Sequence, residues 1–351
     1  MKKALFFILI VIGFSCSHNP MDEKPSIILI IGDGMGIAHL QATKQLKKKE
    51  LVIFSAPIVG MHNTSSSNKY ITDSGAGGTA IATGYKTKNK SIGVDSSGNT
   101  LKNILEISEG LGFSSGVIST SAITHATPAS FIAHVSNRNE YEQIAGAFVN
   151  QNCEVILGGG RNHFMSRSDN RNVIAEMQRK GYKVIHSLEP GMVTSSTKLL
   201  GLVAEEHLPK MSEGRGEFLS NAFNLAMQVF RNNNKPFFIM IEGSQIDWGG
   251  HDNNIDYIVN ETADLDEVVA LAVKYASVHP KTTVIVTADH ETGGLTLTGG
   301  ELNGKLVSNF STKDHTALLA PVFAFGYKKE LFSGVYDNTD LFTKMKTLIE
   351  E

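Results

Sequence analysis

The sequence predicts an α/β protein, a three-layer α/β/α sandwich with a large, mostly parallel central sheet. Short apolar runs rich in β-branched residues alternate along the chain with amphipathic stretches of helical length. Some runs are apolar at every position, as in Ile27-Ile28-Leu29-Ile30-Ile31. Continuous apolar strands of this kind are typical of parallel sheets that helices cover on both faces.

The predicted strands and helices follow one another in a regular order. Strands are expected at Ile27 to Ile31, Gly116 to Thr120, Val155 to Leu157, Phe237 to Ile241, Val284 to Thr287 and Val322 to Phe325. The helices between them include Leu101 to Leu111, Glu140 to Val149, Phe218 to Phe230 and Asn260 to Tyr275. Strands that are joined through helices run parallel to one another, which again predicts a mostly parallel sheet.

The composition indicates a large folded core. Hydrophobic residues make up 41% of the 351 residues, which excludes a disordered chain, and the 33 glycines follow no fixed period, which excludes collagen. The formal net charge is −3 without any block of like charge, so binding of nucleic acid is not expected. The length allows two domains, but large α/β sheets often use this much chain as one.

The N-terminus has the features of an export signal. Lys2 and Lys3 precede an apolar run from Ala4 to Phe14, which ends at Ser15-Cys16. This run is too short to cross a bilayer as a helix. The segment Gly13-Phe14-Ser15-Cys16 resembles a bacterial lipobox, in which the cysteine becomes the lipidated first residue.

These features predict three regions in the chain. Residues 1–15 are expected to be a signal peptide of the lipoprotein type, residues 16–23 a tether, and residues 24–351 a single domain. The lipid on Cys16 would hold an exported protein at a periplasmic or outer surface, and which membrane carries it stays open. The alternative is an ordinary signal peptide with an incidental cysteine. Cys153 is the one cysteine in the expected domain, and it is predicted to be a buried, inert thiol.

Carboxylate and imidazole side chains follow the predicted strands. In an open α/β sheet the ligand binds outside the carboxyl ends of the parallel strands. The residues found there are Asp33, His125, Glu242, Asp289 and His290, with Thr127, Asp247 and His251 close behind them and His315 ahead of the last strand. Asp247 and His251 lie four residues apart, so a helical turn would place them on one face.

Such a cluster predicts bound metal ions. Several carboxylates at one edge of a sheet repel one another unless cations hold them together, so two or more metals are expected. Mixed Asp and His ligands without Cys are typical of catalytic zinc, and a set of Asp, Glu and Thr oxygens is typical of magnesium.

The segment around Ser74 predicts an anion site. Asp73 or Ser74 would cap a helix of small residues that continues to Gly84. Backbone N–H groups and the helix dipole favour an anion at such an N-terminus. The Ser74 hydroxyl is a weak nucleophile at neutral pH, and a metal ion or a base would have to activate it.

Six segments together resemble the bacterial alkaline phosphatases, a family of zinc- and magnesium-dependent phosphomonoesterases. They are Ile31-Gly32-Asp33-Gly34-Met35-Gly36, Thr72-Asp73-Ser74, His125-Ala126-Thr127-Pro128-Ala129 through His134-Val135-Ser136-Asn137-Arg138, Glu242-Gly243-Ser244-Gln245-Ile246-Asp247-Trp248-Gly249-Gly250-His251, Thr287-Ala288-Asp289-His290 and His315-Thr316. They occur in the family's order and extend over about Asp33 to Gly326. The resemblance implies one alkaline-phosphatase-like catalytic domain that hydrolyses phosphate monoesters through a phosphoserine.

The resemblance also implies two zinc ions and one magnesium ion as cofactors. Asp247, His251 and His315 would hold the first zinc, and Asp33, Asp289 and His290 the second. Magnesium would be held by Asp33, Thr127 and Glu242, with waters completing its shell. Ser74 would be the nucleophile, and Arg138 would bind the phosphate.

Three positions depart from the family pattern. His125 stands where many bacterial members have Asp, Trp248 where they have Lys, and Thr292 where many have His. His125 and Trp248 are expected beside the magnesium site rather than among its ligands. A neutral imidazole suits zinc better than hydrated magnesium, so weak magnesium binding is expected. Few residues separate His290 from His315, so any inserted crown subdomain is small, and a homodimer formed through it stays an open expectation.

Two other functions remain open at this point. One is a phosphodiesterase or sulfatase of the same superfamily, although a sulfatase would need x-Pro-x-Arg after its nucleophile, and Ser74-Gly75-Ala76-Gly77-Gly78 lacks it. A diesterase usually lacks the Thr127 and Glu242 pair and Arg138. The other is a non-catalytic surface lipoprotein that binds metal or phosphate, which would be expected to have lost Ser74 or several ligands. The remaining histidines are interpreted as surface or packing residues, and they include His39, His62, His134, His163 and His207.

Overall fold

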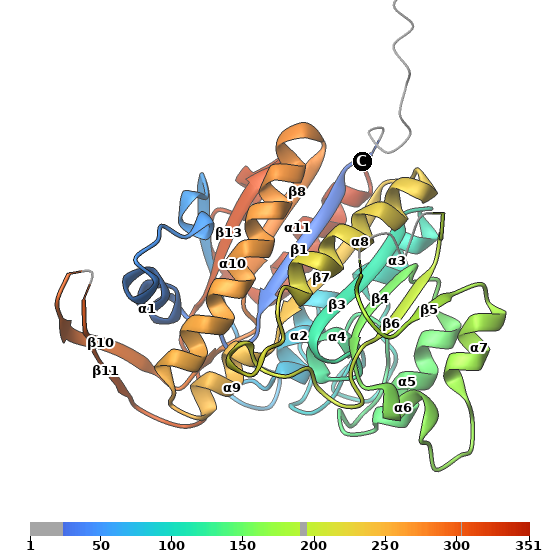
Figure 1. The fold of residues 1–351 in the computed structure, drawn as a ribbon, viewed down its shortest axis with the longest axis horizontal. Coiled ribbons are helices and arrows are strands. Elements are labelled where there is room, and N and C mark those ends of the chain that lie inside the picture. Colours follow the sequence, from blue (N-terminus) through green and yellow to red (C-terminus); the bar gives the residue numbers. More distant parts are fainter. Residues whose placement is uncertain (1–23, 190–194, 303) are drawn as a thin grey trace, which may run out of the picture.

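The computed structural model describes residues 24–189, 195–302 and 304–351, in which helices cover both faces of a central sheet (Figure 1). The strands of this sheet are β1 (Ser26–Gly32), β2 (Ile58–Asn63), β3 (Ser114–Ala122), β4 (Val155–Gly159), β5 (Lys183–Ile185), β6 (Leu199–Leu202), β7 (Phe237–Gly243), β8 (Thr282–Thr287), β13 (Ala320–Gly326) and β14 (Gly334–Asp337). Their order across the 10-stranded sheet is β14-β2-β13-β8-β1-β7-β3-β4-β6-β5. The signal peptide, the tether and Cys16 lie outside the described residues.

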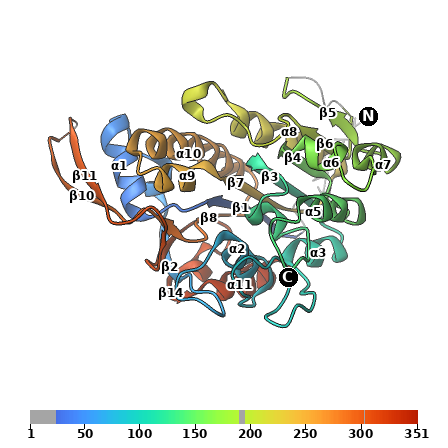
Figure 2. The same ribbon diagram turned by 90° about the horizontal axis from the view of Figure 1, so that it is seen from below.

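The helices pack on the sheet in two layers (Figure 2). They are α1 (Ile37–Lys47), α2 (Ser74–Thr83), α3 (Ile104–Gly110), α4 (Ala126–Ala129), α5 (Tyr141–Ala147), α6 (Arg161–Met165), α7 (Val173–Arg179), α8 (Phe218–Asn233), α9 (Gln245–His251), α10 (Ile255–Val278) and α11 (Asn338–Ile349). Helices α2, α3, α5, α7 and α11 contribute to one core and α1, α8, α9 and α10 to the other. The predicted three-layer α/β/α sandwich is therefore confirmed.

The side chains of β1 show why both faces are covered. Successive residues of a strand point to opposite faces of the sheet. Ile27, Leu29 and Ile31 accordingly lie in one core, whereas Ile28 and Ile30 lie in the other, and all five are fully buried. A strand that is apolar at every position thus predicts two covered faces.

The direction of the strands brings the strand ends that carry the candidate ligands to one edge. From β8 to β5 in the sheet order, each strand pairs in parallel with the next one. Strand β13 runs antiparallel to both β8 and β2. The residues that precede β13 therefore lie at the same edge as the residues that follow β1, β7 and β8, which explains how His315 reaches the other ligands.

The predicted elements are all present with small shifts of their ends. Helix α10 begins at Ile255, five positions ahead of the prediction, because Asn254 caps it by accepting a hydrogen bond from the backbone N–H of Tyr257 at 3.0 Å. The periodicity did not predict β2, β5, β6 and β14, which include both edge strands of the sheet. Their partly exposed positions interrupt the apolar pattern in β2, β5 and β14.

The insertion between His290 and His315 is a hairpin. Strands β10 (Leu295–Gly300) and β11 (Leu306–Phe310) pair antiparallel and extend away from the main sheet (Figure 1). Two short strands, β9 (Glu291–Thr292) and β12 (His315–Thr316), pair at its base. The expected small size of the insertion is confirmed. Among the described helices, none is both long and apolar enough to span a membrane.

Candidate metal and phosphate site

The ligand residues predicted from the sequence lie together at the carboxyl edge of the sheet. Asp33 follows β1, Glu242 lies near the end of β7, and Asp289 and His290 follow β8. Asp247 and His251 lie on the short helix α9, and residues four apart in a helix lie on the same face. His315 lies on β12, which pairs with β9 directly after His290.

Asp247, His251 and His315 form the first group. The Nε2 atom of His251 lies 3.3 Å from Asp247 Oδ2 and 3.3 Å from His315 Nε2, and His315 Nε2 lies 3.5 Å from Asp247 Oδ1. The other ring nitrogens are held by backbone carbonyls, since His251 Nδ1 contacts Lys313 O and His315 Nδ1 contacts Thr72 O. These contacts direct both Nε2 atoms toward Asp247.

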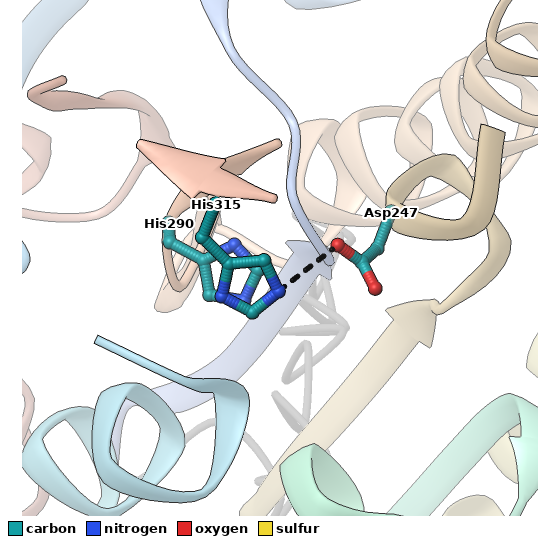
Figure 3. A group of neighbouring side chains, drawn as sticks. All are labelled: Asp247, His290 and His315. Atoms are coloured by element: carbon teal, nitrogen blue, oxygen red, sulfur yellow. Dashed lines mark ion pairs between the residues drawn. The ribbon is translucent and has the colours of Figure 1, made fainter. Parts of the chain in front are cut away.

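Asp33, Asp289 and His290 form the second group. The Nε2 atom of His290 lies 3.4 Å from Asp33 Oδ1 and 3.3 Å from Asp289 Oδ2. All three side chains are fully buried. The rings of His290 and His315 stack with centroids 3.6 Å apart, so the two groups adjoin, and Figure 3 shows both rings facing Asp247.

A third group lies on the other side of Asp33. Asp33, His125 and Glu242 each offer a ligand atom within 4.8 Å of the others. The hydroxyl of Thr127 donates a hydrogen bond to Asp33 Oδ2 at 3.4 Å. Asp33 is therefore shared between the second and third groups, as the family resemblance implies.

Burial and mutual repulsion perturb the acids of this cluster. Burial, followed by the charges of neighbouring carboxylates, raises the pKa of Asp33 well above its usual range and that of Asp289 to about 6. Burial raises the pKa of Glu242 to about 7. Burial acts in the same direction on Asp247, but hydrogen bonding to His251 and the nearby imidazoles outweigh it and lower that pKa. The same contact with Asp247 raises the pKa of His251 to about 9.

Several buried polar atoms of the cluster lack a hydrogen-bond partner among the described residues. They are Asp33 Oδ1, Asp289 Oδ2, Glu242 Oε1 and His125 Nδ1. A buried carboxylate oxygen without a donor is costly unless a cation binds it. Oxygens and imidazole nitrogens that converge in this way fit divalent metal ions. The cluster is thus a set of metal-binding groups.

Ser74 begins helix α2 beside the second group. Asp73 caps the helix by accepting a hydrogen bond from the N–H of Ala76 at 3.0 Å. The Ser74 hydroxyl, on a residue that is 2% exposed, lies 3.2 Å from His290 Nε2. Helix α2 approaches the cluster closely because it is rich in glycine. A Cβ atom at Gly77 would lie 3.1 Å from the carbonyl oxygen of Asp289, and one at Gly78 would lie 2.9 Å from Ser130 Oγ.

Arg138 contacts Asp73 at the N-terminus of α2 and is held at both terminal nitrogens. Its Nη1 atom donates to Asp73 Oδ2 at 3.0 Å, and its Nη2 atom lies 3.3 Å from His125 Nε2. Asp73 therefore caps the helix of Ser74 and positions Arg138 at the same time. Burial, followed by the positive charge of Arg138, lowers the pKa of His125 to about 3. A neutral His125 accepts the Arg138 hydrogen bond at Nε2.

The contacts of Thr292 and Glu291 around the cluster were not predicted from the sequence. The Thr292 hydroxyl donates to Asp247 Oδ1 at 2.5 Å and lies 3.2 Å from His290 Nδ1. Glu291 accepts hydrogen bonds from the N–H groups of Gly294 and Leu295 and from the Thr316 hydroxyl, so it ties β9 to β12. The contacts of Thr292 with Asp247 and of Glu291 with Thr316 join segments that lie 45 and 25 positions apart, so no local signal predicts them.

Three of the remaining histidines differ in their surroundings. His39 and His62 are fully buried, as expected for packing residues, and Gly36 N–H donates to His39 Nδ1 at 2.7 Å. His207 instead lies at the edge of the site. Its ring centroid is 4.8 Å from that of Trp248 and 5.6 Å from that of His125, and its Nδ1 accepts a hydrogen bond from Ala122 N–H at 3.0 Å.

Comparison with known proteins assigns the family. The family model described as "Alkaline phosphatase" matches residues 24–309. The chain belongs to the alkaline phosphatase family. It is 36% identical over 292 residues to Alkaline phosphatase 3 of Bacillus subtilis, covering 79% of this chain and 63% of the relative. The chain thus spans less than two thirds of that relative's length. Alkaline phosphatase 4 of the same organism is 34% identical over 330 residues, covering 89% of this chain and 71% of the relative.

Solved structures of alkaline phosphatases share the fold. The alkaline phosphatase from the Antarctic bacterium TAB5 superposes with a TM-score of 0.90 at 40% identity, covering 93% of this chain and 98% of that chain. A cold-active alkaline phosphatase from Shewanella sp. superposes with a TM-score of 0.85 at 29% identity, covering 93% and 100%. A variant of the TAB5 enzyme with a histidine replaced by aspartate has Mg bound in its M3 site, and it superposes with a TM-score of 0.89 at 38% identity, covering 93% and 98%.

Proposed function

We propose that the chain is an alkaline phosphatase that hydrolyses phosphate monoesters through a covalent phosphoserine on Ser74 and releases inorganic phosphate. One observation carries this assignment. A nearly buried serine hydroxyl at a helix N-terminus lies 3.2 Å from an imidazole of a metal-binding cluster, and Arg138 is fixed beside the same helix end. Phosphoryl transfer needs mainly positioning and charge neutralisation, and this arrangement supplies both.

The cofactors proposed are two zinc ions and one magnesium ion. Asp247, His251 and His315 would hold one zinc, and Asp33, Asp289 and His290 the other. Asp33, Thr127 and Glu242 would hold magnesium. The buried oxygens without partners support this set. When bound, such metals supply positive charge that activates the Ser74 hydroxyl and stabilises the departing alkoxide.

The chain's own residues account for the order of events. The Ser74 hydroxyl loses its proton to water as its oxygen attacks phosphorus. An O–P bond forms, the bond from phosphorus to the alcohol oxygen breaks, and the departing alcohol takes up a proton from water. The N-terminus of α2 favours the negative charge that gathers next to Ser74. The guanidinium of Arg138 binds two phosphate oxygens, and Asp73 keeps it oriented. Water then hydrolyses the phosphoserine, which restores the serine and yields phosphate.

His125 supports the proposal that magnesium binds weakly. A carboxylate beside a magnesium site holds metal-bound waters, and such partners commonly change metal affinity by roughly 10- to 100-fold. Here the position holds a neutral imidazole whose Nε2 faces Arg138. The Mg-bound TAB5 variant with a histidine replaced by aspartate is consistent with this reasoning. Trp248 also provides no positive charge for the substrate phosphate.

The exported location is a further proposal. The Lys2-Lys3 pair, the apolar run and Ser15-Cys16 support a lipid anchor on Cys16. A single acyl chain anchors only marginally, so stable attachment requires more than one. Mass spectrometry of the mature N-terminus tests this proposal, since an unmodified soluble product cleaved elsewhere contradicts it. The oligomeric state, including a homodimer, is measured on the same material by light scattering.

The decisive experiment joins metal analysis with substrate comparison. The purified mature protein is analysed for zinc and magnesium, and its rates are measured on an aryl phosphate monoester, an aryl diester and an aryl sulfate. We expect hydrolysis of the monoester to be far faster than that of the other two. Faster hydrolysis of the diester or sulfate would assign a different hydrolase of the same superfamily, and metal binding without any hydrolysis would assign a binding protein.

A further inference from the structure

Three buried serines form a hydrogen-bonded cluster next to Glu242, and two of them contact one of its oxygens. The hydroxyls of Ser119 and Ser244 both donate to Glu242 Oε2, each at 2.5 Å. Ser121 lies behind them, with its Oγ 2.8 Å from that of Ser119 and 3.0 Å from that of Ser244. All three serines are fully buried. Glu242 therefore has two hydroxyl donors on one oxygen.

The fold fixes both donors firmly. Strands β3 and β7 pair in parallel with Ser119 directly opposite Glu242. Ser244 follows β7, and its backbone N–H donates to Thr120 Oγ1 at 2.9 Å. Ser119 Oγ also accepts a hydrogen bond from the N–H of Ser121 at 3.0 Å. The Ser119 hydroxyl is thus held by a backbone N–H, and the backbone of Ser244 is held by the Thr120 hydroxyl.

The two oxygens of Glu242 have opposite surroundings. A carboxylate oxygen has two lone pairs, and the two serine hydroxyls occupy those of Oε2. Oε1 is buried and has no hydrogen-bond partner in the described part of the chain. It belongs to the carboxylate that lies with Asp33 and His125 in the third group. A cation in that group would thus meet one free oxygen of Glu242.

We propose that Ser119 and Ser244 make Glu242 a one-oxygen ligand and thereby select magnesium over calcium at the third group. Magnesium requires a near-ideal octahedron and short bonds, which single carboxylate oxygens and water provide. Calcium takes six to eight oxygens and often binds a carboxylate through both of them. Because the serine hydroxyls occupy the lone pairs of Oε2, a cation cannot bind Glu242 through both oxygens. This inference rests on the proposed magnesium site and adds the residues that determine its selectivity.

The test compares serine variants in the full mature chain with its zinc restored. The variants are Ser119→Ala, Ser244→Ala and the double variant. Ser121→Ala is the matched control, because Ser121 contacts both serines but not Glu242. Zinc content and circular dichroism verify folding, and the single variants carry the test if the double variant does not fold. Isothermal titration measures magnesium and calcium binding separately, so the result does not depend on activity.

The expected result is a change in selectivity. Loss of both hydroxyls should weaken magnesium binding by roughly 10- to 100-fold, whereas calcium binding should stay the same or become tighter. Ser121→Ala should keep the parent's ratio of magnesium affinity to calcium affinity. Equal losses for both metals would show that the serines only stabilise the fold, and an unchanged ratio would also overturn the inference. A parent protein that hydrolyses monoesters but binds no magnesium would overturn both this inference and the proposed magnesium site, while leaving the phosphatase assignment intact.

Discussion

Replacing Thr292 with valine should weaken zinc binding in both of the zinc groups. Its hydroxyl is the atom that joins them, since it donates to Asp247 Oδ1 and lies 3.2 Å from His290 Nδ1. Thr292 is fully buried. Valine has nearly the same shape as threonine, so Thr292→Val removes the hydrogen bonds and leaves little change in packing.

The magnitude follows from the kind of contact that is lost. A hydrogen bond to a charged group contributes about 1.5–3 kcal/mol. At about 1.4 kcal/mol for each factor of ten, this loss corresponds to roughly 10- to 150-fold in zinc affinity. The same range, roughly 10- to 100-fold, is found when partners that orient metal ligands are removed. Asp247 keeps its contacts with His251 and His315, so binding should weaken without being abolished.

The assay is competition for zinc. The parent, Thr292→Val and Thr292→Ser are loaded with zinc and titrated with a chelator of known affinity, and the zinc retained is measured. Thr292→Ser keeps the hydroxyl and should stay within a few-fold of the parent. If Thr292→Val retains zinc as tightly as the parent, Thr292 does not orient Asp247 and His290. If the serine variant loses zinc equally, the methyl group and not the hydroxyl is responsible.

Four further outcomes are expected. Ser74→Ala should abolish phosphoenzyme formation and lower turnover by orders of magnitude while zinc content stays near normal; labelled phosphate trapped on the denatured variant would contradict this. Arg138→Ala should weaken substrate and phosphate binding together by roughly 10- to 150-fold, for a charged contact of about 1.5–3 kcal/mol; unchanged inhibition by phosphate would assign the contact to another residue. In zinc-restored protein, His125→Asp should reach full activity at a lower magnesium concentration than the parent; maximal parent activity without magnesium refutes this. Burial raises the pKa of Glu154 to about 7, so the folded state favours its protonated form and stability falls as the pH rises from about 4.5 through 7; Glu154→Gln should lessen that fall in denaturant titrations, and parallel pH profiles would show that Glu154 is not its cause.

The strand ends show how much of the site the sequence determined. An apolar strand such as β1 predicts two covered faces, and a parallel sheet places Asp33, Glu242 and Asp289 at one edge without any knowledge of their contacts. The helix cap at Asp73 is equally local, because it involves residues three apart. Periodicity and capping act over a few residues, so a single sequence reveals them.

The contacts that arrange the ligands depend on the tertiary structure. His315 joins the cluster only because β13 runs antiparallel to β8, a direction that its apolar pattern does not reveal. Thr292 lies 45 positions from Asp247 in the chain, and Ser119 lies 123 positions from Glu242. Serine and threonine hydroxyls form hydrogen bonds almost anywhere, so their residue type predicts no particular partner. The sequence by itself determined which side chains lie at the sheet edge. The pairing of the strands decided which carboxylate oxygens have hydrogen-bond partners and which are left for a metal ion.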